Sequence, residues 1–125
     1  MRSTEAEDSL DHHRYQNILL YRILGERMKP TNLNECHEAL TKMNLHDTDM
    51  TPPTLNFFLR SLRNSWGLWE DSPLKKYFIQ QGFTHPDDMS EVIWDSYCAM
   101  REGKEFSLLE AAEKYKAYWA KNRGE

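Results

Sequence analysis

The chain has 125 residues, of which 39% are hydrophobic, 12% aromatic and 29% charged, and these proportions predict one folded domain rather than a disordered segment. Its formal net charge of −4 gives no electrostatic reason to bind nucleic acid, whose phosphates attract clustered Lys and Arg. No apolar stretch approaches the roughly 20 residues that cross a membrane, and the charged N-terminus lacks the apolar region of a signal peptide. We therefore expect a cytoplasmic location.

The first 30 residues predict one helix after a polar end. Residues 1–9 are polar, and we expect them to be frayed. Apolar residues at helical spacing then predict a helix from Leu10 to about Met28, which Pro30 closes. Whether Met1 or Met28 is the natural start stays open.

A capping box predicts the start of the next helix. The side-chain oxygen of Asn32 can accept from a backbone N–H of the first turn, and Glu35 can reach back to the residues before the helix. Apolar residues at spacings of three and four predict a helix over about 33–44. The polar residues 44–51 that follow are typical of a loop.

Two central helices share one kind of start and one kind of end. Each begins with a hydroxyl residue followed by proline in the first turn, and each stops at a glycine that can adopt a left-handed conformation. The pairs are Thr51-Pro52 with Gly67, and Ser72-Pro73 with Gly82. We expect Leu55, Phe58, Leu59, Leu62 and Trp66 to form the buried face of the first of them.

Two further helices complete the chain. His85-Pro86 predicts a start, with His85 or Thr84 as the cap, and Gly103 predicts the stop. Ser107 and Glu110 form a second capping box. No segment alternates at period two, so we expect an all-α fold: a compact single-domain bundle of about six helices over residues 10–125.

The sequence holds no motif that specifies a reaction. Cys36 and Cys98 lie too far apart in sequence for a metal-type pair, and we expect two reduced thiols, although a disulfide stays open. His46 with Asp47 and Asp49 has the composition of an ordinary polar loop. We expect no metal site and no cofactor.

One cluster of ionisable residues has two interpretations. His85 beside Asp87 and Asp88 could act as a general acid–base unit. The sequence favours a structural role, because carboxylates in the first turn complement the positive end of the helix dipole.

Arginine and tryptophan residues near Gly67 can likewise have either a structural or a functional role. Arg60 and Arg63 could clamp an anion or a partner carboxylate, or pair with Glu70, Asp71 or the carboxylates at 87 and 88. We expect Trp66 in the core, Trp69 in the following loop as a possible contact for a partner, and Trp94 partly exposed.

These residues carry a resemblance to an uncharacterised bacterial domain family. Members share a core of the form NNWGLW…S.L..YF…G..HPDDMS, and this chain matches it over residues 64–90, within a resemblance that covers about 31–119. It departs from the pattern at Ser65, where the family has a second asparagine, so only Asn64 of that pair is present.

The resemblance implies no activity, but small acidic domains of this type often serve as immunity proteins or antitoxins. We therefore expect a non-enzymatic domain that binds a protein partner, plausibly a toxin. An alternative is a small-ligand-binding protein or an enzyme with its site at the Trp66–Trp69 turn and His85–Asp88. The candidate contact residues are Arg60, Arg63, Asn64, Trp69, Glu70, Asp71, His85, Asp87, Asp88 and Trp94.

Overall fold

A computed structural model describes residues 29–43 and 50–123 of the chain. These residues form five helices: α2 (Leu33–Lys42), α3 (Pro52–Ser65), α4 (Pro73–Gln80), α5 (Pro86–Arg101) and α6 (Leu108–Arg123). No strand occurs in the described ranges, so the predicted all-α class is confirmed. The count is five rather than about six, because the helix predicted over 10–28 lies outside the described residues.

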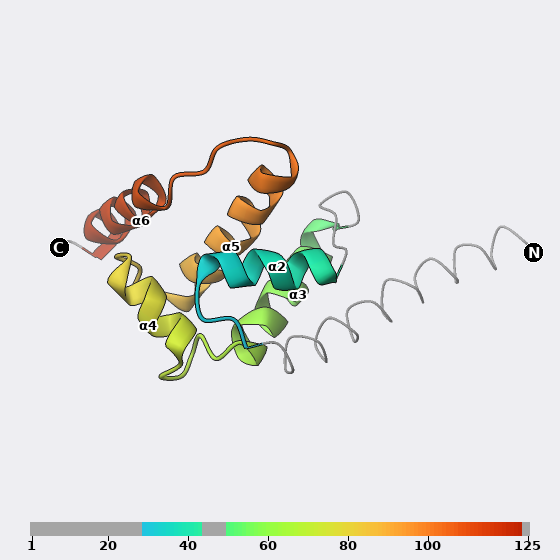
Figure 1. Cartoon of the computed structure of the whole chain (residues 1–125). Helices are drawn as coiled ribbons and strands as arrows, with labels where there is room; N and C mark the ends of the chain where they lie inside the picture. The colour runs from blue at the N-terminus through green and yellow to red at the C-terminus, as the bar shows by residue number, and fades with distance from the viewer. Residues whose placement is uncertain (1–28, 44–49, 124–125) are drawn as a thin grey trace, which may run out of the picture.

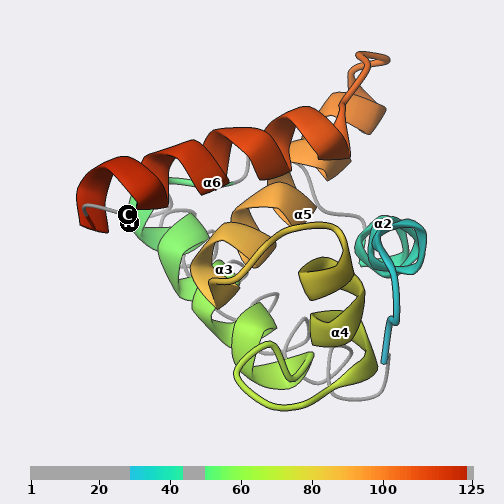
Figure 2. The ribbon, with the colours of Figure 1, turned by 90° about the vertical axis from the view of Figure 1, so that its left-hand side faces the viewer.

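Helix α5 occupies the centre of the fold. It packs against α3, α2 and α6. Figure 2 shows α3 and α2 on opposite sides of α5, with α6 running across the top, and Figure 1 shows α4 beside the lower end of this group. The core follows from this arrangement, since the most deeply buried large side chains include Met89, Ile93 and Tyr97 of α5 together with Phe78, Phe83 and Leu40 from the surrounding elements.

The predicted side-chain caps are confirmed for four of the helices. The side chains of Asn32, Thr51, Ser72 and Ser107 each accept a hydrogen bond from the backbone N–H three residues later. Glu35 reaches one residue further back than a capping box predicts, because its Oε1 accepts from both the backbone N–H and the hydroxyl of Thr31.

The predicted start of α5 at Pro86, with His85 as the N-cap residue, is confirmed, but the side-chain cap is not. His85 is the residue before the first turn, but its side chain makes no capping hydrogen bond. The proline that follows has no N–H to satisfy, and the acidic first turn supplies the complementary charge.

The turn after α3 is held by its glycine. Gly67 has φ +72°, and a Cβ there would lie 3.1 Å from the Cβ of Ser72, so both the backbone conformation and the limited space favour glycine. The turn buries Trp66 and Leu68 and leaves Trp69 with 56% of its surface exposed.

Trp94 corrects another expectation. We predicted it to be partly exposed, yet only 6% of its surface is accessible. It packs edge-on against Phe58 of α3, with ring centroids 5.8 Å apart. Helix α5 has partners on several sides, so residues off its main apolar stripe are buried as well. Cys36 and Cys98 are not joined by a disulfide.

None of the described helices combines the length and the apolar character that crossing a membrane requires.

Candidate functional site

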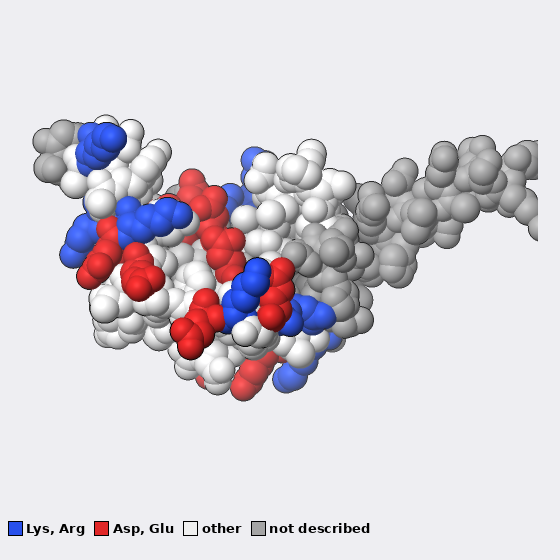
Figure 3. Space-filling view, turned by 90° about the horizontal axis from the view of Figure 1, so that it is seen from above, with Lys and Arg blue, Asp and Glu red and all other residues white. Residues whose placement is uncertain are grey.

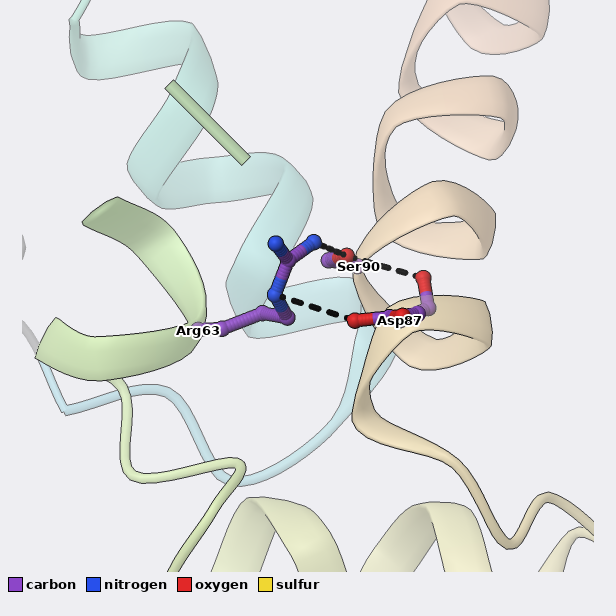
Figure 4. A network of polar contacts seen from close by, with 3 residues as sticks. All are labelled: Arg63, Asp87 and Ser90. Atoms are coloured by element: carbon purple, nitrogen blue, oxygen red, sulfur yellow. Dashed lines mark hydrogen bonds and ion pairs between the residues drawn. The ribbon is translucent and has the colours of Figure 1, made fainter. Parts of the chain in front are cut away.

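The first turn of α5 directs neighbouring polar side chains toward two different helices. On the α3 side, the Nη1 of Arg63 donates to the hydroxyl oxygen of Ser90 at 2.9 Å, and that hydroxyl donates to the backbone oxygen of Asp87 at 2.9 Å. The Nε of Arg63 lies 3.4 Å from Asp87 Oδ1, which makes an ion pair rather than a hydrogen bond. Figure 4 shows this network bridging the two helices.

On the opposite side, Asp88 faces α6. Its Oδ2 accepts from the indole N–H of Trp119 at 2.7 Å, and the residue is only 7% exposed. His85 stacks on the same indole, with ring centroids 3.7 Å apart and an angle of 26° between the planes. One tryptophan of the last helix therefore contacts both the residue before α5 and a carboxylate of its first turn.

Acidic side chains continue along the α6 side of α5. Glu91 accepts a hydrogen bond from the hydroxyl of Tyr115 at 2.9 Å. Burial raises the pKa of Asp88 and of Asp95, and Glu91 adds to both shifts by charge repulsion. The pKa of Tyr115 is also raised, chiefly by burial and then by its hydrogen bond to Glu91. This side of α5 thus carries negative charge in partly desolvated surroundings.

A groove of about 440 Å³ runs along the outer side of α3 and the turn that follows it. The Nζ of Lys29 donates to the backbone oxygen of Ser65 at 3.3 Å, which brings the segment before α2 to the edge of this groove. The groove is lined by Lys29, Phe57, Arg60, Ser61, Asn64, Ser65, Trp66, Gly67, Glu70 and Ser72. We call this feature the α3 groove.

Two arginines one turn apart on α3 differ in their surroundings. Arg63 is tied to α5, as described above. Arg60 lines the α3 groove, is exposed, and has neither an ion pair nor a hydrogen bond with any described residue. Phe57, on the same side of α3, exposes half of its surface.

The α3 groove also contains a buried donor without an acceptor. Trp66 is 4% exposed, and its indole N–H has no hydrogen-bond partner among the described residues. An unpaired buried donor costs about 1–3 kcal/mol, which the packing of the rest of the indole must offset.

The remaining candidates in the turn lie at the surface. Trp69 and Glu70 are exposed, and Asp71 makes a long ion pair of 3.8 Å with Lys76 of α4. Such exposed pairs contribute little to stability.

The predicted candidates therefore separate into groups. Asn64 lines the α3 groove, whereas Asp88 lines a second pocket on the α6 side of α5. Trp94 lies in the core between α3 and α5 and has no exposed surface of useful size. The structure does not bring Asn64, His85 and Asp88 into one cavity. No group of three or more potential metal ligands occurs in the described ranges, and the loop with His46 lies outside them.

Sequence reasoning missed the contribution of α6. Trp119 and Tyr115 were not among the predicted candidates, yet both bond to carboxylates of α5. A signal was present, because Asp88, Glu91 and Asp95 recur at spacings that place them on one side of a helix.

The fold and these contacts define a small all-α domain organised around α5. A family model described as a domain of unknown function (DUF6794) matches residues 57–101, that is, from α3 to the end of α5. The expected resemblance to an uncharacterised domain family is confirmed over this segment. Neither a curated protein nor a solved structure matches the chain.

Proposed function

We propose that this protein is a non-enzymatic protein-binding domain of the bacterial cytosol, whose partner docks on the α3 groove and on the exposed Trp69 of the turn that follows α3. The observation that carries the proposal is the contrast between the two arginines of α3. Arg63 binds α5, whereas Arg60 has no partner among the described residues and lies in a groove next to an exposed phenylalanine.

The chemistry of the α3 groove suits a polypeptide. Hydroxyl and amide groups from Ser61, Ser65 and Asn64 can exchange hydrogen bonds with a peptide backbone. Phe57 and Trp69 offer the aromatic surface that is enriched at protein interfaces, and Arg60 offers a guanidinium for a carboxylate of the partner.

The charge distribution supports a protein partner over a nucleic acid. Acidic and basic side chains are mixed on the face that Figure 3 shows, rather than gathered in a patch of one sign. A mixed surface favours a partner with complementary charges of both signs, whereas a phosphate backbone favours clustered cations.

Site-specific photocrosslinking in the native host tests the docking surface. A photoreactive phenylalanine analogue replaces Phe57 on α3 in one variant and Ile79 on α4 in a matched control, since the two side chains are 50% and 51% exposed. We expect one protein to crosslink at position 57 and not at position 79. Identical products at both positions, or none at 57, would contradict the proposal.

We further propose that the partner is a toxin that this protein inhibits. The net charge of −4 would suit a basic partner. The test is to express the captured protein alone and together with this chain. Growth arrest that co-expression relieves is the expected result, and a captured protein that is harmless when expressed alone would contradict it.

A further inference from the structure

A second pocket, separate from the α3 groove, lies between α6 and the beginning of α5. It has a volume of about 170 Å³. Since one water occupies about 30 Å³ in the liquid, the pocket can hold a group of several heavy atoms but not a nucleotide-sized ligand.

Aromatic rings and one carboxylate form much of its lining. Phe83 and Tyr115 contribute rings whose centroids lie 6.1 Å apart, and Trp119 contributes the indole on which His85 stacks. Asp88 contributes a carboxylate, and only 7% of the surface of this residue is accessible to solvent.

This carboxylate is positioned but not neutralised. The indole N–H of Trp119 binds Oδ2 and fixes the side chain, yet no Lys or Arg of the described ranges makes an ion pair with Asp88. Glu91 and Asp95 add negative charge from α5, while His85, Lys114 and Lys116 are the nearby groups that can carry positive charge. Lys116 lines the pocket without a partner among the described residues.

We infer that this pocket, between Phe83, Asp88, Tyr115 and Trp119, binds a small organic ammonium group. Aromatic rings attract an alkylammonium ion through their negative faces, and the fixed carboxylate of Asp88 supplies the counter-charge. The group can belong to a free amine or to a lysine side chain of another protein. The inference does not depend on the α3 groove or on its proposed partner.

An NMR titration tests it with defined probes. The indole ¹⁵N–¹H signal of Trp119, which Trp119→Phe identifies by its loss, is followed during addition of tetramethylammonium chloride at constant ionic strength. We expect a saturable shift. Tert-butanol, a neutral molecule of similar shape, should cause no saturable shift at the same concentrations.

Two carboxylate variants make the test specific. Asp88→Asn keeps an acceptor oxygen for Trp119 but removes the charge, and should weaken binding at least tenfold. Asp87→Asn removes the neighbouring charge, which faces α3, and should leave the affinity within twofold. Equal shifts with tert-butanol, or an unchanged affinity in a folded Asp88→Asn variant, would overturn the inference.

The source of the ammonium group is then assigned with two further probes. Saturable binding of Nα-acetyl-lysine-N′-methylamide supports a lysine side chain. Binding of methylammonium without binding of the lysine derivative supports a free amine. If Asp88→Asn does not fold, the comparison of tetramethylammonium with tert-butanol on the unmodified protein still decides, and absence of any saturable shift overturns the inference.

Discussion

Asp87 and Asp88 are adjacent in the sequence, but they contribute to different parts of the molecule. The side chain of Asp87 is 69% exposed and reaches Arg63 of α3, whereas Asp88 is buried and accepts from Trp119 of α6. Successive residues of a helix point about 100° apart, so one turn of α5 can bind two neighbouring helices. The comparison shows how one acidic turn joins the two sides of the fold.

Substitutions on the α3 side and on the α6 side of α5 should differ in their effect on the free energy of unfolding. The ion pair between Arg63 and Asp87 has one largely exposed partner, the carboxylate of Asp87, and such solvent-screened pairs are worth about 0–1 kcal/mol. A buried carboxylate that loses its donor costs more, because its desolvation is no longer compensated. We therefore expect the α6 side to be more sensitive to substitution than the pair between Arg63 and Asp87.

Trp119→Ala should have the largest effect. It removes half-buried aromatic surface, the stacking with His85 and the donor to Asp88, and we expect a loss of about 2–4 kcal/mol in the free energy of unfolding. Urea denaturation measures it. Trp69→Ala is the matched control, since that indole is exposed, and should change stability by less than about 0.5 kcal/mol. Equal losses in the two variants would mean that α6 is not docked through Trp119.

Arg63→Met should have the next largest effect. It leaves the hydroxyl of Ser90 without its charged donor and Asp87 without its ion pair, and we expect a loss of about 1–2 kcal/mol. Arg60→Met is the control on the same helix and should stay within about 0.5 kcal/mol, because Arg60 has no partner among the described residues. A larger loss in Arg60→Met than in Arg63→Met would mean that Arg60, and not Arg63, stabilises the fold.

The pH dependence of stability should have opposite signs on two sides of α5. Burial lowers the pKa of His37, a residue of α2 whose ring Nε2 forms a hydrogen bond with the hydroxyl of Ser96 of α5. The unfolded chain then binds the proton more readily, so this contribution makes stability fall as pH drops below the ordinary histidine range of about 6.5.

Asp88 and Asp95 act in the other direction. Their raised pKa values mean that the folded protein binds protons more readily, so their contribution makes stability rise as pH falls toward the ordinary carboxyl range of about 4. Denaturation midpoints between pH 4 and 7 measure both terms. His37→Gln should remove the acid-sensitive term and Asp88→Asn part of the opposing one. Unchanged pH profiles in both variants would contradict the burial of these groups.

Asp87→Asn should have the smallest effect on stability. The variant removes the charge of an exposed carboxylate from its pair with Arg63, and we expect a loss of at most about 1 kcal/mol that shrinks as salt is added. Urea denaturation at low and high salt measures it. A loss as large as that of Trp119→Ala would contradict the assignment of the more stabilising contact to the α6 side of α5.

The sequence predicts the local structure well because local chemistry determines it. Thr51 and Ser72 cap their helices as expected, and Gly67 adopts the left-handed conformation that stops α3. Capping oxygens and backbone conformation depend on residues within one turn, so they need no knowledge of the tertiary fold.

Contacts between distant residues are less accessible from the sequence. Trp94 was predicted to be partly exposed, but α5 has neighbours on several sides and Trp94 is buried. The spacing of Arg60 and Arg63 gives no indication that only Arg63 reaches α5. Likewise, the bond between Asp88 and Trp119 joins residues 31 positions apart, and no local pattern specifies such a pair.

We propose that side chains without partners among the described residues, above all Arg60, bind the protein partner, while those with partners hold the helices together. The most direct test is isothermal titration calorimetry of Arg60→Met against the protein captured through position 57. We predict at least a tenfold loss of affinity, about 1.4 kcal/mol, with an unchanged free energy of unfolding. An affinity equal to that of the unmodified protein would contradict the account.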